Sequence, residues 1–206
     1  MKANYLESTI KQFEYYKMLG EQTLTQLADE NLFWQFNEDS NSIATIIKHL
    51  WGNMMSRWTD FLVTDGEKEW RNRDAEFEND IATKQDMIAK WNEGWKVLLD
   101  TLRSLKEDDL DQIIYIRNEG HTVLEAINRQ LAHYPYHIGQ IVFIGKMCAE
   151  RWNSLSIPKG KSAQYNAAKF SKPKERGHFT GDALNKDEDT PSLILTSGDT
   201  RFTEQM

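Results

Sequence analysis

Two histidines, His133 and His137, limit what this chain can fold into more than any other feature of its sequence. They lie four residues apart, so on an α-helix of about 3.6 residues per turn their imidazoles project from one face. Mostly apolar residues continue this face, which predicts that it points into the core: Ala126, Ile144 and Cys148. A single buried histidine is usually a neutral core residue with hydrogen-bonded ring nitrogens. An inward-facing pair favours a shared metal ion, because one cation satisfies both acceptor nitrogens.

Pro135 stands between the two histidines. A proline inside a helix removes the hydrogen bond to the carbonyl four residues earlier, which here belongs to Leu131, so we expect the helix axis to bend. The alternative is that Pro135 ends one helix and starts another. In that case the two imidazoles would no longer share a face.

The spacing of apolar residues predicts four amphipathic helices, over residues 5–27, 42–62, 83–105 and 122–152. Ser42 and Thr83 are candidate N-caps, and Thr122 forms a capping box with Glu125. Residues 111–120 have the pattern of a short strand followed by a turn. The predicted fold is therefore all-α, an antiparallel four-helix bundle with a short strand and turn before its last helix.

The bundle is expected to occupy residues 1–155, with an irregular extension over residues 156–206. Prolines and glycines are frequent in the extension and large apolar residues are few, which is typical of a draped or disordered tail. Residues 159–176 are basic and residues 182–189 are acidic. Such charged blocks are usually solvated, and the alternative is contact with an acidic surface of a partner.

Composition excludes several classes of protein. A chain of 206 residues is long enough for one domain with a sizeable core. The net charge of −7 argues against nucleic-acid binding, which generally needs a concentrated basic face. The sequence has neither an apolar signal region nor a run long enough to cross a membrane. The single cysteine, Cys148, fits a reducing compartment, so we expect a cytoplasmic protein.

His49 is a third candidate ligand, on a polar line along the otherwise apolar second helix. If the second and fourth helices are neighbours, His49 can meet His133 and His137 from the opposite wall. Three imidazoles with one open position are typical of a catalytic zinc site, and nickel, iron, cobalt or manganese are also admissible. Asn53 and Gln140, each within about one turn of a histidine, are candidates to orient the ligands or to join helices. The alternative is that His49 is only a polar residue under a loop.

The segment Ile-Ile-Lys-His49-Leu-Trp-Gly-Asn, together with His133-Tyr-Pro-Tyr-His137-Ile-Gly-Gln-Ile, resembles the DinB/YfiT-like metalloenzyme superfamily. The resemblance covers residues 1–155. It implies an up-down-down-up four-helix bundle, often a homodimer, with a divalent metal held by His49, His133 and His137. It also implies relatives that attach low-molecular-weight thiols such as bacillithiol, mycothiol or glutathione to electrophiles, or use them in isomerisation.

The residues between the two histidines of the pair bear on the reaction. A metallopeptidase helix carries His-Glu-x-x-His, whereas here the intervening residues are Tyr134, Pro135 and Tyr136. Hydrolysis would need a base from elsewhere, such as Asp60 or a glutamate. Thiol transfer needs less, because a metal lowers the pKa of a coordinated thiol.

We therefore predict a zinc- or nickel-dependent transferase that joins a small thiol to an electrophile. The alternatives are a non-catalytic metal-binding or stress-related interaction protein and, third, a metal-dependent hydrolase. No nucleic-acid or membrane partner is expected.

Overall fold

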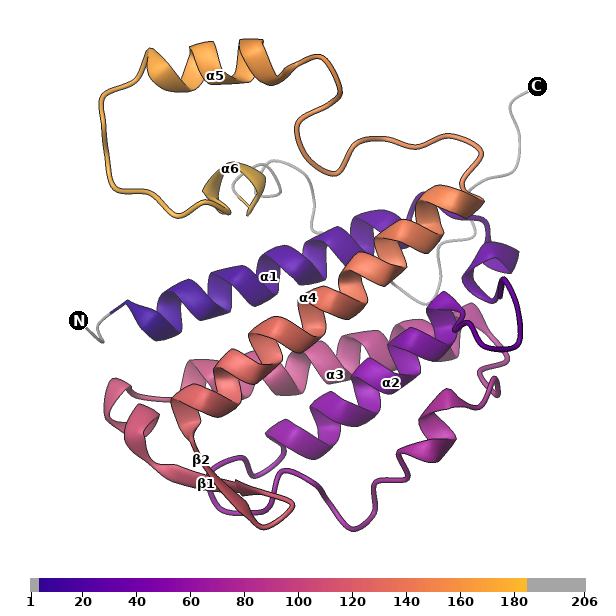
Figure 1. The fold of residues 1–206 in the computed structure, drawn as a ribbon, viewed down its shortest axis with the longest axis vertical. Helices are drawn as coiled ribbons and strands as arrows, with labels where there is room; N and C mark the ends of the chain where they lie inside the picture. The colour runs from indigo at the N-terminus through magenta and orange to yellow at the C-terminus, as the bar shows by residue number, and fades with distance from the viewer. Residues whose placement is uncertain (1–3, 185–206) are drawn as a thin grey trace.

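Four long helices dominate the computed structural model, which describes residues 4–184 (Figure 1). They are α1 (Tyr5–Leu24), α2 (Ile43–Trp58), α3 (Lys84–Ser104) and α4 (Val123–Cys148). Helix α2 packs along α3 and α1 packs along α4, α1 also contacts α3, and α2 contacts α4. The protein is mostly helical, as predicted, and α2 and α4 are neighbours.

The predicted caps start three of these helices. The hydroxyl oxygens of Ser42 and Thr83 accept hydrogen bonds from backbone N–H groups of the first turn. Thr122 and Glu125 form the predicted capping box. The helix ends lie earlier than the apolar spacing predicts, by three residues in α1 and by four in α2 and α4. In α2 the chain leaves the helix just before Asp60, whose backbone is left-handed with φ of 49°.

Helix α4 is continuous through Pro135. The interpretation that Pro135 divides two helices is therefore wrong, and His133 and His137 stay on one face. Buried side chains on both sides of the proline, Tyr134 and Ile138, hold this part of α4 against the core. Packing of this kind offsets the backbone hydrogen bond that proline removes.

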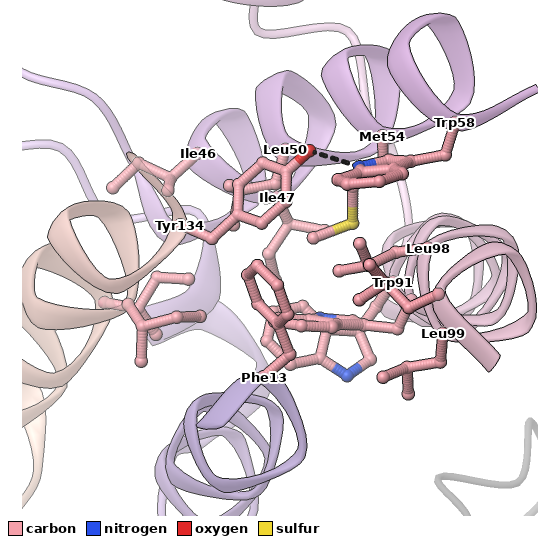
Figure 2. Packing of buried hydrophobic residues seen from close by; sticks show 14 of the residues in the cluster. Phe13, Ile46, Ile47, Leu50, Met54, Trp58, Trp91, Leu98, Leu99 and Tyr134 are labelled. Atoms are coloured by element: carbon pink, nitrogen blue, oxygen red, sulfur yellow. Dashed lines mark hydrogen bonds between the residues drawn. The ribbon is translucent and has the colours of Figure 1, made fainter. Parts of the chain in front are cut away.

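Tyr134 anchors the histidine-bearing turn of α4 in an aromatic core (Figure 2). Its ring packs against Phe13 of α1, with centroids 5.8 Å apart. Its hydroxyl accepts a hydrogen bond from Trp58 Nε1 at 2.9 Å and donates one to Asn53 Oδ1 at 2.9 Å. Both partners belong to α2, so this buried network fixes α4 relative to α2.

The connections contain more regular structure than predicted. A 3₁₀ turn, η1 (Asp29–Leu32), follows α1, and η3 (Glu107–Asp111) precedes a hairpin of β1 (Ile113–Ile116) and β2 (Glu119–Thr122). The strands pair antiparallel. Only the first strand was predicted, because the second, Glu-Gly-His-Thr, lacks the apolar alternation of a strand.

The connection between α2 and α3 contains regular structure away from Trp70. Its 3₁₀ turn, η2, lies at Asp74–Phe77 and packs against α2. The Asp65 carboxylate of the same connection accepts hydrogen bonds from the backbone N–H groups of Arg117 and Asn118 in the hairpin turn. These contacts tie η2 and its flanking residues to the body of the protein.

The extension after residue 155 is not wholly irregular. It contains α5 (Ser162–Phe170) and α6 (Gly181–Leu184), and α5 is built from good helix formers such as Ala163, Ala167 and Ala168. The basic residues of segment 159–176 are exposed, in agreement with a solvated block. His178 contacts Ser8 of α1 at 3.0 Å. Residues 185–189 of the acidic block, and the apolar residues 193–195 of the sequence, lie outside the described residues. Between residues 4 and 184, no helix has the length and apolarity needed to span a bilayer.

Candidate metal centre

Three imidazoles meet between α2 and α4. His49 Nε2 lies 3.3 Å from His133 Nε2, which lies 3.1 Å from His137 Nε2. The prediction that these histidines come together is confirmed, and this group could hold a metal ion. His49 also lies under a connecting segment, since its ring stacks on Phe77 of η2 with centroids 4.9 Å apart. The two interpretations of His49 are thus compatible.

The second ring nitrogen of each histidine faces a side-chain oxygen. His49 Nδ1 lies 2.8 Å from Glu76 Oε2. His133 Nδ1 lies 3.2 Å from Gln130 Oε1, and His137 Nδ1 lies 2.8 Å from Gln140 Oε1. Carboxylate and amide oxygens only accept, so each Nδ1 carries the proton and donates it. Each Nε2 is therefore left with a free lone pair, and the lone pairs converge.

This arrangement fits a divalent metal. The Nε2 atom of His133 lies 3.3 Å and 3.1 Å from those of His49 and His137, and all three lie within 4.8 Å of one another, so their lone pairs repel unless a cation lies between them. Two nitrogens that are each about 2.1 Å from a tetrahedral zinc lie roughly 3.4 Å apart, close to the separations found here. Three protein ligands leave one position open, as in catalytic zinc sites.

The protonation states of His133 and His137 also suit metal binding. Burial lowers the pKa of His133 to about 3, with further lowering by the neighbouring His137, His49 and Arg129. Burial also lowers the pKa of His137. This effect is larger than the opposite effect of the hydrogen bond to Gln140, which raises the pKa. Both imidazoles are thus neutral at physiological pH, which is the form that binds metals.

Glu76 is one of two residues supporting the histidines, with Gln130, that were not predicted from the sequence. It lies on η2, is 4% exposed and accepts the His49 proton through Oε2. Arg71 donates to both of its oxygens, from Nε to Oε1 at 2.7 Å and from Nη2 to Oε2 at 3.0 Å. Burial raises the pKa of Glu76, but the hydrogen bonds from His49 and Arg71 outweigh it and leave the pKa below its usual value. Glu76 is therefore a carboxylate that orients His49.

Gly52 makes room for this carboxylate. A Cβ at position 52 would lie 2.3 Å from Glu76 Oε1, so the side chain reaches His49 only because α2 has a glycine one turn further on. A glycine inside an apolar helix was the one signal in the sequence for a close approach here. It does not reveal which residue approaches.

The two residues proposed from spacing to support the ligands have different partners. Gln140 contacts His137, whereas Asn53 accepts from Tyr134 and so belongs to the hydrogen-bond network of the core. Gln130, one turn before His133, supports that histidine and was not predicted.

Arg71 and Arg129 act electrostatically on His133. Arg71 Nη1 bonds Glu67 at 3.0 Å, and Arg57 is 3% exposed with Nε and Nη1 lacking hydrogen-bond partners within the described residues. The nearest carboxylate contact of Arg57 is Glu67 at 4.0 Å. Arg129 precedes His133 by one helical turn and is exposed. Arg71 is paired with Glu76 and Glu67, so Arg57 and Arg129 are the guanidinium groups that favour a negatively charged ligand.

Comparison with known proteins places this centre within a family. A search of curated proteins finds no match to the sequence. A family model, described as a protein of unknown function (DUF1572), matches residues 1–161, a range that includes the three histidines, Glu76 and Gln140. Because this match covers well over half of the chain, the protein belongs to the DUF1572 family.

Proposed function

We propose that this protein is a divalent-metal-dependent enzyme that transfers a low-molecular-weight thiol to an electrophile. The metal, zinc or nickel in this proposal, is held by His49, His133 and His137. The observation that carries the proposal is the convergence of the Nε2 atoms while all three Nδ1 atoms donate to oxygens. We also propose that the protein acts as a homodimer in the cytoplasm.

The finer fold assignment belongs to the same proposal. We assign α1 to α4 to the up-down-down-up four-helix bundle of the DinB/YfiT-like superfamily. The pairing of α1 with α4 and of α2 with α3 supports this assignment, as do histidines on the second and fourth helices.

A metal at this centre would act as a Lewis acid and lower the pKa of a coordinated thiol. The protein's residues add positive charge, because Arg71 and Arg129 act electrostatically on His133 and Arg57 acts on both of these arginines. In the transfer, the thiolate sulfur forms a bond to carbon while the bond from that carbon to its leaving group breaks. The thiol proton goes to solvent and the leaving group departs with the electron pair.

Glu76 explains why we place hydrolysis behind thiol transfer. A metal-dependent hydrolase generally uses a free carboxylate as base beside the bound water. Both oxygens of Glu76 are taken by His49 and Arg71. Asp60, the other candidate base, lies beyond the last residue of α2 and is exposed.

The test uses protein purified without an affinity metal column. Elemental analysis identifies the metal, and turnover is followed with bacillithiol, glutathione or cysteine and 1-chloro-2,4-dinitrobenzene, from which chloride leaves. His133→Ala should lose metal and at least about 100-fold of the rate. His178→Ala, which removes a histidine of the extension, is the matched control. If His133→Ala turns over as fast as the wild type, the proposed function is wrong; metal binding without turnover on any electrophile would favour a non-catalytic metal-binding protein.

A further inference from the structure

An apolar pocket of about 470 Å³ lies beside the candidate metal centre. Its walls include Trp34 and Phe36 from the loop before α2 and Phe143 and Met147 from α4. Phe36, Phe143 and Met147 are more than half exposed, at 74%, 64% and 51%. Large apolar side chains gathered around a hollow at the surface are typical of a binding site.

The pocket and the metal centre share walls. Ile46 lines the pocket and precedes His49 by three residues on α2, about one helical turn. Gln140 also lines the pocket, follows His137 by three residues on α4, and accepts the proton of His137 Nδ1. A molecule in the pocket would therefore touch a side chain that holds a metal ligand.

The arginines of these two helices lie in one direction from the histidines, whereas Lys48 and Lys146 lie in the other direction and do not line the pocket. Arg57 follows His49 on α2, and Arg129 precedes His133 on α4, so both lie in the direction opposite to Ile46 and Gln140. The pocket has no lysine or arginine in its lining, and its charged residue is Asp39. An anionic thiol fits the arginine side of the histidines, and an uncharged apolar group fits the pocket.

We infer that this pocket binds the apolar, aromatic part of the electrophile and so determines which acceptors the enzyme uses. The inference rests on the proposed function. The pocket volume is within the range of small-molecule sites, about 300–1,000 Å³, which favours a small molecule over a second copy of the chain. Aromatic walls favour a planar ring, and the flexible Met147 can adapt to rings of different shape.

Binding is tested separately from turnover with an unreactive probe, 1,3-dinitrobenzene, by saturation-transfer NMR. Phe143→Ser and Met147→Gln should each weaken probe binding by about fivefold or more. Both side chains are exposed, so neither change should affect folding. Phe170→Ser, on α5 and 85% exposed, is the matched control and should bind the probe as the wild type does. His133→Ala should also retain probe binding, because the pocket does not need the metal.

A second readout concerns specificity. The ratio of kcat/KM for 1-chloro-2,4-dinitrobenzene to that for iodoacetamide, which has no ring, should fall about tenfold in Phe143→Ser. Unchanged probe binding and an unchanged ratio would overturn the inference. It would also be overturned if the substitutions dissociated a dimer in light scattering without affecting the probe. Probe binding that depends on Phe143 in a protein without turnover would support the pocket and refute the proposed reaction.

Discussion

Glu76 Oε2 lies 2.8 Å from His49 Nδ1, and this contact joins a connecting turn to the histidine-bearing face of α2. The carboxylate fixes the orientation of the ring and directs Nε2 towards His133. It also raises the basicity of His49 as a ligand. A loop residue therefore completes a centre whose other parts are helical.

Glu76→Gln should weaken metal binding by roughly 10- to 100-fold, the usual effect of losing such a partner. The amide retains the size of the side chain but carries no negative charge to oppose Arg71 or to strengthen His49. Affinity is measured by competition with a chromophoric chelator. Glu78→Gln, two residues further on and exposed, should bind metal as the wild type does. Equal affinity in Glu76→Gln and wild type would show that the carboxylate does not support the ligand.

Gly52→Ala should disturb the same contact from the other side. The added methyl would lie 2.3 Å from Glu76 Oε1, so the carboxylate must move away from His49. We expect a loss of about 1–3 kcal/mol in unfolding free energy, typical of overpacking, together with weaker metal binding.

Gly139→Ala on α4 is the matched control, because a Cβ there meets no atom within 4 Å. It should leave stability unchanged or raise it by up to about 1 kcal/mol through helix propensity. Denaturant unfolding measures both variants. Equal stabilities in the two variants would contradict the close approach of Glu76 to α2.

Much of the fold could be predicted from the sequence because its signals are local. The Ser42 and Thr83 caps and the capping box of Thr122 are each set within three residues, and the structure has all three. Helix ends were less accurate, since apolar spacing continues into residues that pack on the core after the helix has ended. Leu27 and Phe61 are such residues, buried but outside α1 and α2.

The three histidines could be predicted because their helical spacing and the adjacency of two helices bring them together. Glu76 could not, since it lies 27 residues from His49 in a connection without periodicity. Asn53 shows the opposite error. Its spacing from His49 is suitable, but its side chain is directed to the buried hydroxyl of Tyr134. Which partner a polar side chain takes depends on packing between helices, and spacing along one helix does not contain that information.

Removing the metal should destabilise the protein. A ligand whose free concentration is about 100 times its Kd adds about 2.7 kcal/mol to the free energy of unfolding. For a chain of this length that corresponds to roughly 5–10 °C in Tm. The measurement is calorimetry before and after dialysis against a chelator, with metal added back to restore Tm. His49→Ala should melt at the same temperature with and without chelator, and a chelator effect in that variant equal to that in wild type would place the metal elsewhere.

The metal-free protein should lose stability as the pH falls below about 6.5. Burial lowers the pKa of His133 to about 3 and also lowers that of His137, whereas both titrate near 6.5 in the unfolded chain. Below that pH the two histidines bind protons in the unfolded state but not in the folded state. Each such histidine then removes up to about 1.4 kcal/mol of unfolding free energy per pH unit, until the pH reaches the folded pKa.

Urea unfolding at about pH 7.5 and about pH 5.5 measures this effect above the range in which carboxylates titrate. Metal-free His133→Asn should lose less stability between these two pH values than the metal-free wild type, because it lacks one of the two groups. His178→Asn changes a histidine of the extension that contacts Ser8, and should follow the wild type. If His133→Asn loses as much unfolding free energy between the two pH values as the wild type does, protonation of His133 is not the cause of the loss. It would also remove the argument that this imidazole is held neutral and ready to bind a cation.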